Sequence, residues 1–426
     1  MIRLSSLVGL TCAGFTSVAV LSAGSWSFVR GPQGDGTTPE KIPATWPAQG
    51  PKVLWRVPSQ KGFSSFSVAD GRAFTLELRE VEGAPQEVLV ARNADTGAEL
   101  WVKALGAVKY QGGGDSGTSD NKGGDGPRST PTISGDRVYV TSAKLVLSCF
   151  DAKSGSLVWQ QDLLKDFGGK NISWENAASP LVEEGLVLVA GGGAGQSLVA
   201  FNATDGKVVW KAFDETMTHA TPTPATIHGQ RQVIFFVKSG LLSVEPKTGK
   251  ELWRYSFPFR VSTAASPVVA GDIVYCSAGY GVGAGACKVS KDGTAWTAKE
   301  IYRFSGDKPL ANHWSTPVLH DGHLYGMFQF KEYGDGPVKC VDVATGKVNW
   351  EKPGFGPGHV ILAGNQVLAL GDAGQLVLIE ATPSGYRELA RADVLDGKCW
   401  TTPVLSNGRI YARSTKEAVC LDFSGK

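Results

Sequence analysis

The chain has 426 residues, of which 54 are glycine and 12 are tryptophan, and its 42 basic and 40 acidic residues leave a formal net charge of +2. This balanced composition is typical of a folded globular protein and excludes a disordered chain. The sequence has no basic run and no zinc-finger or helix-based reading motif, so nucleic acid is excluded as a partner.

Residues 1–24 are predicted to be a signal peptide. Arg3 is the only charged side chain there, residues 4–21 are apolar, and Ser22-Ala23-Gly24 offers a cleavage region. The protein is therefore expected to be exported, to the periplasm or the extracellular space. The alternative is membrane association through an uncleaved N-terminal segment, because the apolar run approaches the ~18–20 residues that span a bilayer. Residues 25–50, rich in Pro, Gly and polar residues, are expected to form an N-terminal arm.

A turn followed by a tryptophan recurs along the rest of the chain. Its copies end at Trp101, Trp159, Trp210, Trp253, a shortened copy at Trp296, and Trp350, while residues 383–389 keep the turn without the tryptophan. Successive tryptophans lie 43 to 58 residues apart, which is the period of a four-stranded propeller blade. The Gly of each copy supplies the positive φ of a tight turn. Each large ring is expected to fill the seam between two blades.

Small residues recur six positions before the turn glycine, and they include cysteines. They are Ala91, Cys149, Ala200, Ser243 and Cys340, with Cys420 at the same place in the last repeat. We expect them to be buried and to pack against the neighbouring tryptophan rings. Cys276 and Cys287 fall on adjacent predicted strands, and whether they form a disulfide is left open. The absence of any Cys-x-x-Cys excludes zinc-ribbon and haem-attachment sites.

Each repeat begins with a short run of hydroxyl residues and proline. The second residues of these runs are Thr130, Ser179, Thr221, Ser266, Thr316 and Thr402, with looser copies at residues 64–66 and 358–360. Proline suits the first residue of an edge strand, here the innermost strand facing a central channel. Eight starts predict eight blades.

The two ends of the repeat region complement each other. The last unit stops at its turn, and residues 51–57 provide a tryptophan strand with no unit before it. Pairing residues 53–57 with the strand that ends near 422 would close the ring. We therefore predict an all-β fold, one eight-bladed β-propeller of four-stranded antiparallel blades over residues 51–426.

These repeats resemble the tryptophan-docking repeat of pyrroloquinoline quinone (PQQ) propellers, over about residues 51–426. Residues 26–36 are similar to the start of secreted bacterial PQQ-like repeat proteins. The resemblance implies the fold, whereas many such propellers carry no quinone.

The PQQ dehydrogenases among these propellers use an Asp base, a calcium ion held by Glu, Asn and Asp, and often a vicinal cysteine pair. This chain has no vicinal pair, and Glu175-Asn176 stands without an accompanying Asp in a recognisable motif. PQQ with calcium is therefore a possible cofactor that the motifs do not support, and no catalytic residue is assigned.

If the protein binds a ligand, the expected site is the channel mouth, where residues just before the inner strands converge. The candidate binding residues are Arg128, Trp174, Glu175, Asn176, His219, His313, Trp314, His359 and Trp400, with Phe63 and Arg260 at the same edge. Aromatic, imidazole and guanidinium groups suit a planar or anionic ligand. The alternative is that these groups only plug and solvate the mouth.

No metal site is predicted. Asp115, Asp120 and Asp125 lie in the Gly-rich stretch 111–126, but their spacing matches no calcium loop, so a surface loop is favoured. His320 and His323 flank a predicted hairpin turn, where a solvated turn is favoured over a metal site.

The favoured function is an exported, non-catalytic binding or scaffolding propeller, whose partner is an unidentified protein or small molecule at the mouth. The main alternative is a PQQ-dependent oxidoreductase acting on an alcohol or a sugar. A third hypothesis follows from similarity to the propeller that scaffolds outer-membrane protein assembly. That hypothesis requires a lipid anchor, for which Cys12 lies in the wrong context.

Overall fold

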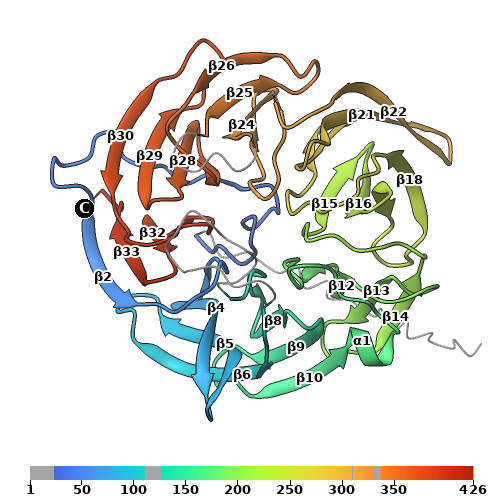
Figure 1. The fold of residues 1–426 in the computed structure, drawn as a ribbon, viewed down its shortest axis with the longest axis horizontal. Coiled ribbons are helices and arrows are strands. Elements are labelled where there is room, and N and C mark those ends of the chain that lie inside the picture. The colour runs from blue at the N-terminus through green and yellow to red at the C-terminus, as the bar shows by residue number, and fades with distance from the viewer. Residues whose placement is uncertain (1–23, 111–125, 309, 330–335, 426) are drawn as a thin grey trace, which may run out of the picture.

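The computed structural model describes residues 24–110, 126–308, 310–329 and 336–425. In this part of the chain eight sheets, seven of four strands and one of five, are arranged in a ring around a central channel (Figure 1). The prediction of an all-β, eight-bladed propeller is confirmed. Its one helix within the described ranges is the short α1 (Leu163–Asp166).

Blades 1 to 4 follow one another along the chain, each running from an inner to an outer strand. Blade 1 contains β3 (Ser67–Ala69), β4 (Arg72–Val81), β5 (Ala84–Asn93) and β6 (Glu99–Ala107). Blade 2 contains β7 (Thr132–Ser134), β8 (Arg137–Thr141), β9 (Val146–Asp151) and β10 (Leu157–Asp162). Blade 3 contains β11 (Leu181–Glu183), β12 (Leu186–Ala190), β13 (Leu198–Asn202) and β14 (Val208–Ala212). Blade 4 contains β15 (Thr223–Ile227), β16 (Gln230–Val237), β17 (Gly240–Val244) and β18 (Glu251–Ser256).

Blades 5 to 8 repeat this order and complete the ring. Blade 5 contains β19 (Val268–Ala270), β20 (Ile273–Ala278), β21 (Gly283–Asp292) and β22 (Ala295–Phe304). Blade 6 contains β23 (Val318–His320), β24 (His323–Met327), β25 (Val338–Asp342) and β26 (Val348–Lys352). Blade 7 contains β27 (Gly358–Ala363), β28 (Gln366–Gly371), β29 (Gln375–Glu380) and β30 (Glu388–Asp393). Blade 8 contains β31 (Val404–Ser406), β32 (Arg409–Arg413), β33 (Glu417–Asp422) and, from the N-terminal side, β2 (Lys52–Pro58).

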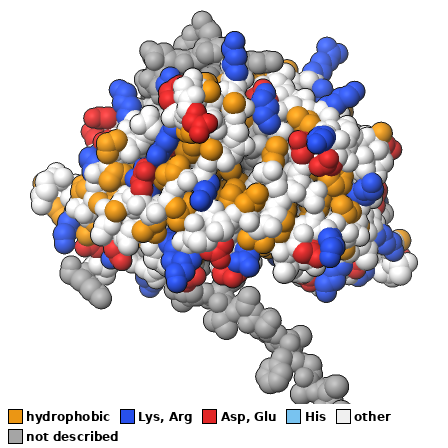
Figure 2. Space-filling model, turned by 90° about the horizontal axis from the view of Figure 1, so that it is seen from below, with side chains coloured by type: hydrophobic (Ala, Val, Ile, Leu, Met, Phe, Trp, Pro, Cys, Tyr) orange, Lys and Arg blue, Asp and Glu red, His pale blue; other side chains and the backbone are white. Residues whose placement is uncertain are grey.

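The core lies between neighbouring blades. Middle strands such as β28 and β29 are buried on both faces, whereas outer strands such as β18 alternate between more buried and exposed residues. Seen from below, the rim shows apolar groups scattered among charged ones (Figure 2). The exposed aliphatic residues of the outer strands of blades 8 and 1 to 3 are Val53, Leu100, Leu157, Val158, Val208 and Val209.

At four seams the tryptophan of one blade packs on the turn glycine of the next. A Cβ on Gly97 would lie 2.8 Å from Cδ2 of Trp55, and the Trp55 indole N–H donates to the Ala94 carbonyl at 2.9 Å. Gly97 also has a φ of +74°, so both backbone and space require glycine. The same arrangement joins Trp101 to Gly155, Trp159 to Gly206 and Trp210 to Gly249.

The repeats of blades 4 and 5 depart from this pattern. The indole N–H of Trp253 donates to the Gln232 side chain of its own blade, and the ring of Phe304 takes the tryptophan's place against Gly346. The reason is the long hairpin of β21 and β22, which carries Trp296 outward to its tip, where it packs near His228.

The small residues that were predicted to pack against aromatic rings are cross-strand partners of the tryptophans in their own blades. The cross-strand pairs are Ala91 with Trp101, Cys149 with Trp159, Ala200 with Trp210, Ser243 with Trp253, Cys340 with Trp350 and Cys420 with Trp55. All six small residues are buried. Cys276 and Cys287 lie on adjacent strands but are free thiols, with Cys287 opposite Val274 and Cys276 opposite Gly285.

The ring is closed as predicted. β2 pairs antiparallel with β33, and Trp55 lies opposite Cys420. Arg413 reinforces the junction, because its fully buried guanidinium donates to the carbonyl oxygens of Ser64 and Leu76 in blade 1.

Residues 26–38 cross one end of the channel (blue, centre of Figure 1). Trp26 is fully buried and bridges Val68 of blade 1, with each backbone N–H donating to the other's carbonyl at 2.8 Å. Farther on, β1 (Thr37–Thr38) joins blade 7 as a fifth strand, parallel to β27. The arm therefore ties together blades that are distant in the sequence.

Two predictions from the sequence concern residues that the structure does not describe. Residues 1–23 and 111–125 lie outside the described residues, and with them the signal peptide apart from Gly24 and the Asp115, Asp120 and Asp125 loop. No helix in the described ranges has the length and apolar character of a membrane span. His320 and His323 are cross-strand partners flanking a turn, and no metal-binding group of three or more His, Cys, Asp or Glu exists among the described residues.

Candidate binding site at the channel mouth

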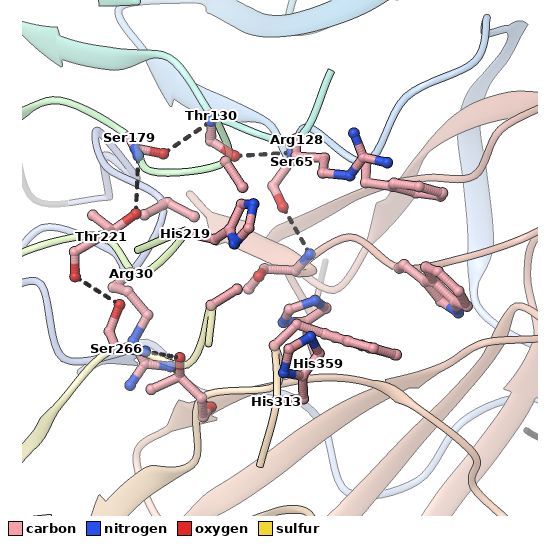
Figure 3. A pocket seen from close by; sticks show the side chains of 18 of the residues that line it. Arg30, Ser65, Arg128, Thr130, Ser179, His219, Thr221, Ser266, His313 and His359 are labelled. Atoms are coloured by element: carbon pink, nitrogen blue, oxygen red, sulfur yellow. Dashed lines mark hydrogen bonds between the residues drawn. The ribbon is translucent and has the colours of Figure 1, made fainter. Parts of the chain in front are cut away.

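The channel contains a cavity of about 420 Å³ (Figure 3). The arm contributes Val29 and Arg30 to its lining. The Arg30 guanidinium donates to the carbonyl oxygens of Thr316 at 3.1 Å and Pro317 at 2.9 Å. The arm forms one end of the cavity, here called the floor, and Arg30 attaches it to blade 6. The opposite end of the cavity is the channel mouth.

A layer of hydroxyl groups surrounds the cavity. It is formed by Ser65, Thr130, Ser179, Thr221, Ser266, Thr316 and Thr402, which stand just before the inner strands. Most are linked blade to blade: the Ser65 N–H donates to the Thr130 hydroxyl at 3.0 Å, and the Thr130 N–H donates to that of Ser179 at 2.9 Å (Figure 3). A hydroxyl that accepts such a bond still has its own proton to donate. His359 takes the equivalent place in blade 7.

Above the hydroxyl layer the cavity is ringed by aromatic side chains. This aromatic collar consists of Phe63, Trp174, His219, Tyr280, His313, Trp314 and Trp400. Trp314 and Trp400 have ring centroids 5.0 Å apart, and those of Trp174 and Tyr280 are 6.0 Å apart with the rings 19° from parallel. Phe63 lies 5.1 Å from Trp400, and Tyr280 lies 4.9 Å from His313. The collar is therefore a nearly continuous chain of ring contacts.

Unusual backbone conformations position part of the collar. Trp174, Glu175 and Tyr280 have φ values of +67°, +63° and +60°. Non-glycine residues rarely adopt this left-handed region, and such strain concentrates at functional sites. Two consecutive left-handed residues turn the loop so that Trp174 lines the cavity while Glu175 does not.

Arg128 closes the collar between Phe63 and Trp174. Its guanidinium donates to the Trp174 carbonyl at 3.0 Å and lies 5.8 Å from the Phe63 ring and 5.2 Å from the Tyr110 ring. Behind it lies the buried Glu87, which accepts hydrogen bonds from the Tyr110 hydroxyl at 2.5 Å and from the Ala143 N–H at 2.7 Å. Burial raises the pKa of Glu87.

Glu175 and Asn176 belonged to the predicted set, but they lie behind the cavity wall. Glu175 pairs with Lys144 at 3.1 Å, and the Asn176 amide bonds the backbone of Ala178 at 3.0 and 3.1 Å. Both side chains have structural partners. The cavity does contain the other seven predicted residues, Arg128, Trp174, His219, His313, Trp314, His359 and Trp400.

Two cavity histidines are neutral at physiological pH. Burial lowers the pKa of His219 to about 4, and the charge of Arg128 adds to the effect. Burial also lowers the pKa of His359 to about 4, with Arg30 as the nearby charge. The His219 ring bonds the Ser173 carbonyl through Nε2 at 2.9 Å and the Ser262 hydroxyl through Nδ1. The fixed positive charge of the lining therefore comes from arginine.

Sequence reasoning missed Tyr280, Arg30 and the hydroxyl layer. The candidate mouth residues were chosen because each lies just before an inner strand. Tyr280 lies instead in the turn between β20 and β21, so this criterion did not select it. The runs of hydroxyl residues were recognised in the sequence as the starts of the repeats. Their position just before the inner strands could have indicated that they line the channel. Arg260, expected at the mouth, does not line the cavity.

The lining does not fit a calcium-held quinone. Among its described residues there is no Asp, Glu or Asn, whereas calcium requires carboxylate and carbonyl oxygens. No carboxylate among the described lining residues is placed to act as a general base. The arrangement is suited to binding a ligand by stacking and hydrogen bonding.

Fold and cavity together define a PQQ-type β-propeller with an aromatic-lined channel. A family model described as "Outer membrane protein assembly factor BamB" matches residues 84–327 and 334–424. The chain belongs to this family.

Individual relatives are distant. The chain is 23% identical over 265 residues to the outer membrane protein assembly factor BamB of Shewanella oneidensis, a match covering 59% of the chain and 64% of the relative. It is 24% identical over 282 residues to BamB of Burkholderia pseudomallei, covering 65% and 68%. The chain thus spans less than two thirds of the Shewanella protein.

Solved structures share the fold. The crystal structure of BamB from Moraxella catarrhalis matches with a TM-score of 0.60 and 13% identity, covering 88% of this chain and 100% of that one. The quinohemoprotein alcohol dehydrogenase of Comamonas testosteroni matches with a TM-score of 0.63 and 14% identity, covering 95% and 81%. These likenesses concern the fold alone.

Proposed function

We propose that the protein is an exported, non-catalytic binding or scaffolding propeller that holds its ligand or partner at the channel mouth. The observation that carries this proposal is the cavity lining, where aromatic rings, hydroxyls and Arg128 converge without a carboxylate among the described residues. Such a lining can recognise a ligand, and its described residues offer no carboxylate to hold a calcium-bound quinone.

Family membership supports a scaffolding role. The relatives are named as outer membrane protein assembly factors, and no reaction appears in that name. We extend to this chain the idea of a propeller that supports the assembly of other proteins, with a partner protein met at the mouth. Photo-crosslinking from position 400 in the exporting cell tests it. A crosslink that disappears when the same group is moved to the rim at position 387 supports a partner at the mouth.

The rival function is a PQQ-dependent oxidoreductase. Purified protein incubated with PQQ and calcium should show no stable quinone absorbance and no dye-linked oxidation of alcohols or sugars. Turnover above that of a heat-denatured control would reject the non-catalytic assignment.

Export through a cleaved signal peptide of residues 1–24, leaving an arm over 25–50 and a propeller over 51–426, is part of the proposal. The proposal also assigns the tryptophan–glycine contacts to the tryptophan-docking motif of this repeat. Cell fractionation and the mass of the mature N-terminus test the export. A protein that retains residue 1 and sediments with membranes would favour the uncleaved anchor.

A further inference from the structure

We infer that residues 26–38, here called the strap, are a releasable closure of the channel floor, held in place by Arg30 (Figure 1). With the strap seated, the cavity is reached from the mouth alone. Release of the strap opens a second entrance while the ring of blades stays closed. The inference goes beyond the proposed function, because it concerns access to the cavity, whatever the cavity holds.

The strap and the closure of the ring use different segments of the chain. The ring is closed by β2, which pairs with β33 over six residue pairs from Lys52 to Pro58. The strap lies upstream and attaches through the bridge of Trp26 to Val68 and through the two residue pairs of β1 with β27. Because the blade seam at β2 does not use the strap, the strap can lift without exposing the edge of a blade.

The two ends of the strap are bound mainly by backbone groups. The Ile133 N–H of blade 2 donates to the Ser27 carbonyl at 2.8 Å, and the Leu362 N–H of blade 7 donates to the Gly36 carbonyl at 2.9 Å. Trp26 and Phe28 are buried apolar anchors near its start. A short segment held by a few such contacts opens at a lower free energy than the whole fold.

Arg30 fastens the middle of the strap. Its buried guanidinium donates to the Asp35 carbonyl at 2.8 Å, which folds the strap on itself. It also donates to the carbonyls of Thr316 at 3.1 Å and Pro317 at 2.9 Å, which attaches the strap to blade 6 (Figure 3). A buried guanidinium without these acceptors would be left with unpaired donors. Replacing Arg30 therefore removes both side-chain hydrogen bonds to blade 6.

Gly36 completes this attachment. Its N–H donates to the Arg30 carbonyl at 2.7 Å, and its φ is +83°. A Cβ added here would lie 2.9 Å from Cγ1 of Val318 in blade 6 and 3.0 Å from Cζ of Arg30. Any side chain at this position would therefore push the strap away from blade 6. The glycine-rich sequence of residues 30–36 thus forms the turns that bring Gly36 back onto Arg30.

The strap has one side toward the cavity and one side away from it. Val29 lines the cavity, whereas Gln33 is exposed. A thiol at either position reports on one side of the strap. A bulky polyethylene-glycol maleimide is too large to enter a cavity of about 420 Å³. Such a reagent reaches position 29 when the strap lifts, and it reaches position 33 at all times.

The test uses the full protein carrying Val29→Cys or Gln33→Cys. The unsubstituted protein gives the background, because its cysteines in the described ranges are buried. We expect the bulky maleimide to modify the Val29→Cys protein at least about a hundredfold more slowly than the Gln33→Cys protein. The reason is that modification at position 29 depends on the small population in which the strap is lifted.

Two variants release the strap in different ways. Arg30→Met or Gly36→Ala, added to Val29→Cys, should bring the rate to within about tenfold of that of Gln33→Cys. The cooperative unfolding transition of the ring should remain in both. Arg137→Met is the matched control, because Arg137 follows the turn after inner strand β7 and pairs with Asp151 at 3.2 Å within blade 2. It should leave the slow rate unchanged.

Three outcomes would overturn the inference. Equal rates for Val29→Cys and Gln33→Cys would show that the floor is open. A slow rate at position 29 that neither Arg30→Met nor Gly36→Ala raises would show that Arg30 does not hold the strap. Loss of the ring's unfolding transition in both variants would show that the strap and the ring are one unit. The comparison of positions 29 and 33 decides whether the floor is closed even if the releasing variants fail to fold. The tests of oxidation and of a partner at the mouth are independent of all three.

Discussion

Tryptophans occupy two regions of this molecule with different surroundings. At the rim, Trp159 lies against Gly206 of the next blade, and its indole N–H donates to the Ala203 carbonyl at 3.0 Å. At the mouth, Trp400 contacts other rings, Phe63 at 5.1 Å and Trp314 at 5.0 Å. The rim ring is enclosed by backbone of two blades, whereas the collar ring is partly exposed to the cavity. We therefore predict that the rim tryptophans serve stability, and we propose that the collar serves recognition.

The strongest test of this comparison is Trp159→Ala at the rim. Trp159 is 8% exposed and packs between blades 2 and 3. Its removal should lower the free energy of unfolding by about 3–5 kcal/mol, the usual cost of deleting a buried large aromatic side chain. Chemical denaturation measures the change. A loss no larger than that of Trp400→Ala would contradict the division between rim and collar.

Gly206→Ala is expected to have the next largest effect. The new Cβ would lie 2.6 Å from Cδ2 of Trp159, and Gly206 has a φ of +69°. Overpacking and backbone strain together should cost about 2–4 kcal/mol.

Gly185→Ala is the matched control for this prediction. Gly185 has a φ of +80° but no atom within 4 Å of its added Cβ. It should cost about 1 kcal/mol, from backbone strain alone. Equal losses in the two variants would show that the tryptophan contact contributes little.

Lowering the pH should destabilise the channel mouth, where the buried histidines lie, before it destabilises the seams at the rim. The pKa of His219 and of His359 is lowered to about 4 by burial, from 6.5. Between these values the unfolded chain binds protons that the folded histidines do not, so stability is fully present above pH 6.5 and falls as pH falls toward 4. We expect a loss on the order of 3 kcal/mol for each of the two histidines, with the raised pKa of Glu87 opposing it.

Thermal denaturation across pH 4 to 7 checks this expectation. His219→Gln should flatten the slope, whereas His320→Gln, at the end of β23, should preserve it. An unchanged slope in the first variant would show that the buried imidazole is not responsible.

The smallest effect on stability is expected for Trp400→Ala. Because this ring is partly exposed, its removal should cost less than about 2 kcal/mol. The affinity for a ligand held at the mouth should nevertheless fall about tenfold. Calorimetry of unfolding and of binding on the same sample separates the two effects. A large loss of stability with unchanged affinity would make the collar a structural plug.

The repeats in the sequence determined the blades, their number and the closure of the ring. The turn glycine acts locally, so the same short sequence forms the same hairpin wherever it occurs, as the φ values of +74° at Gly97 and +69° at Gly206 illustrate. The same periodicity located most mouth residues, because whatever precedes an inner strand lies at one end of the channel.

Only the tertiary structure decided which of these side chains face the cavity. Consecutive left-handed residues at Trp174 and Glu175 send one side chain inward and the other behind the wall, which no spacing rule reveals. Arg30 reaches the lining because the arm crosses the channel to Thr316, 286 residues away in the chain. Tyr280 joins the collar through contacts with a neighbouring loop. Such long-range contacts depend on packing between blades, whereas the repeat pattern reports only what happens within one blade.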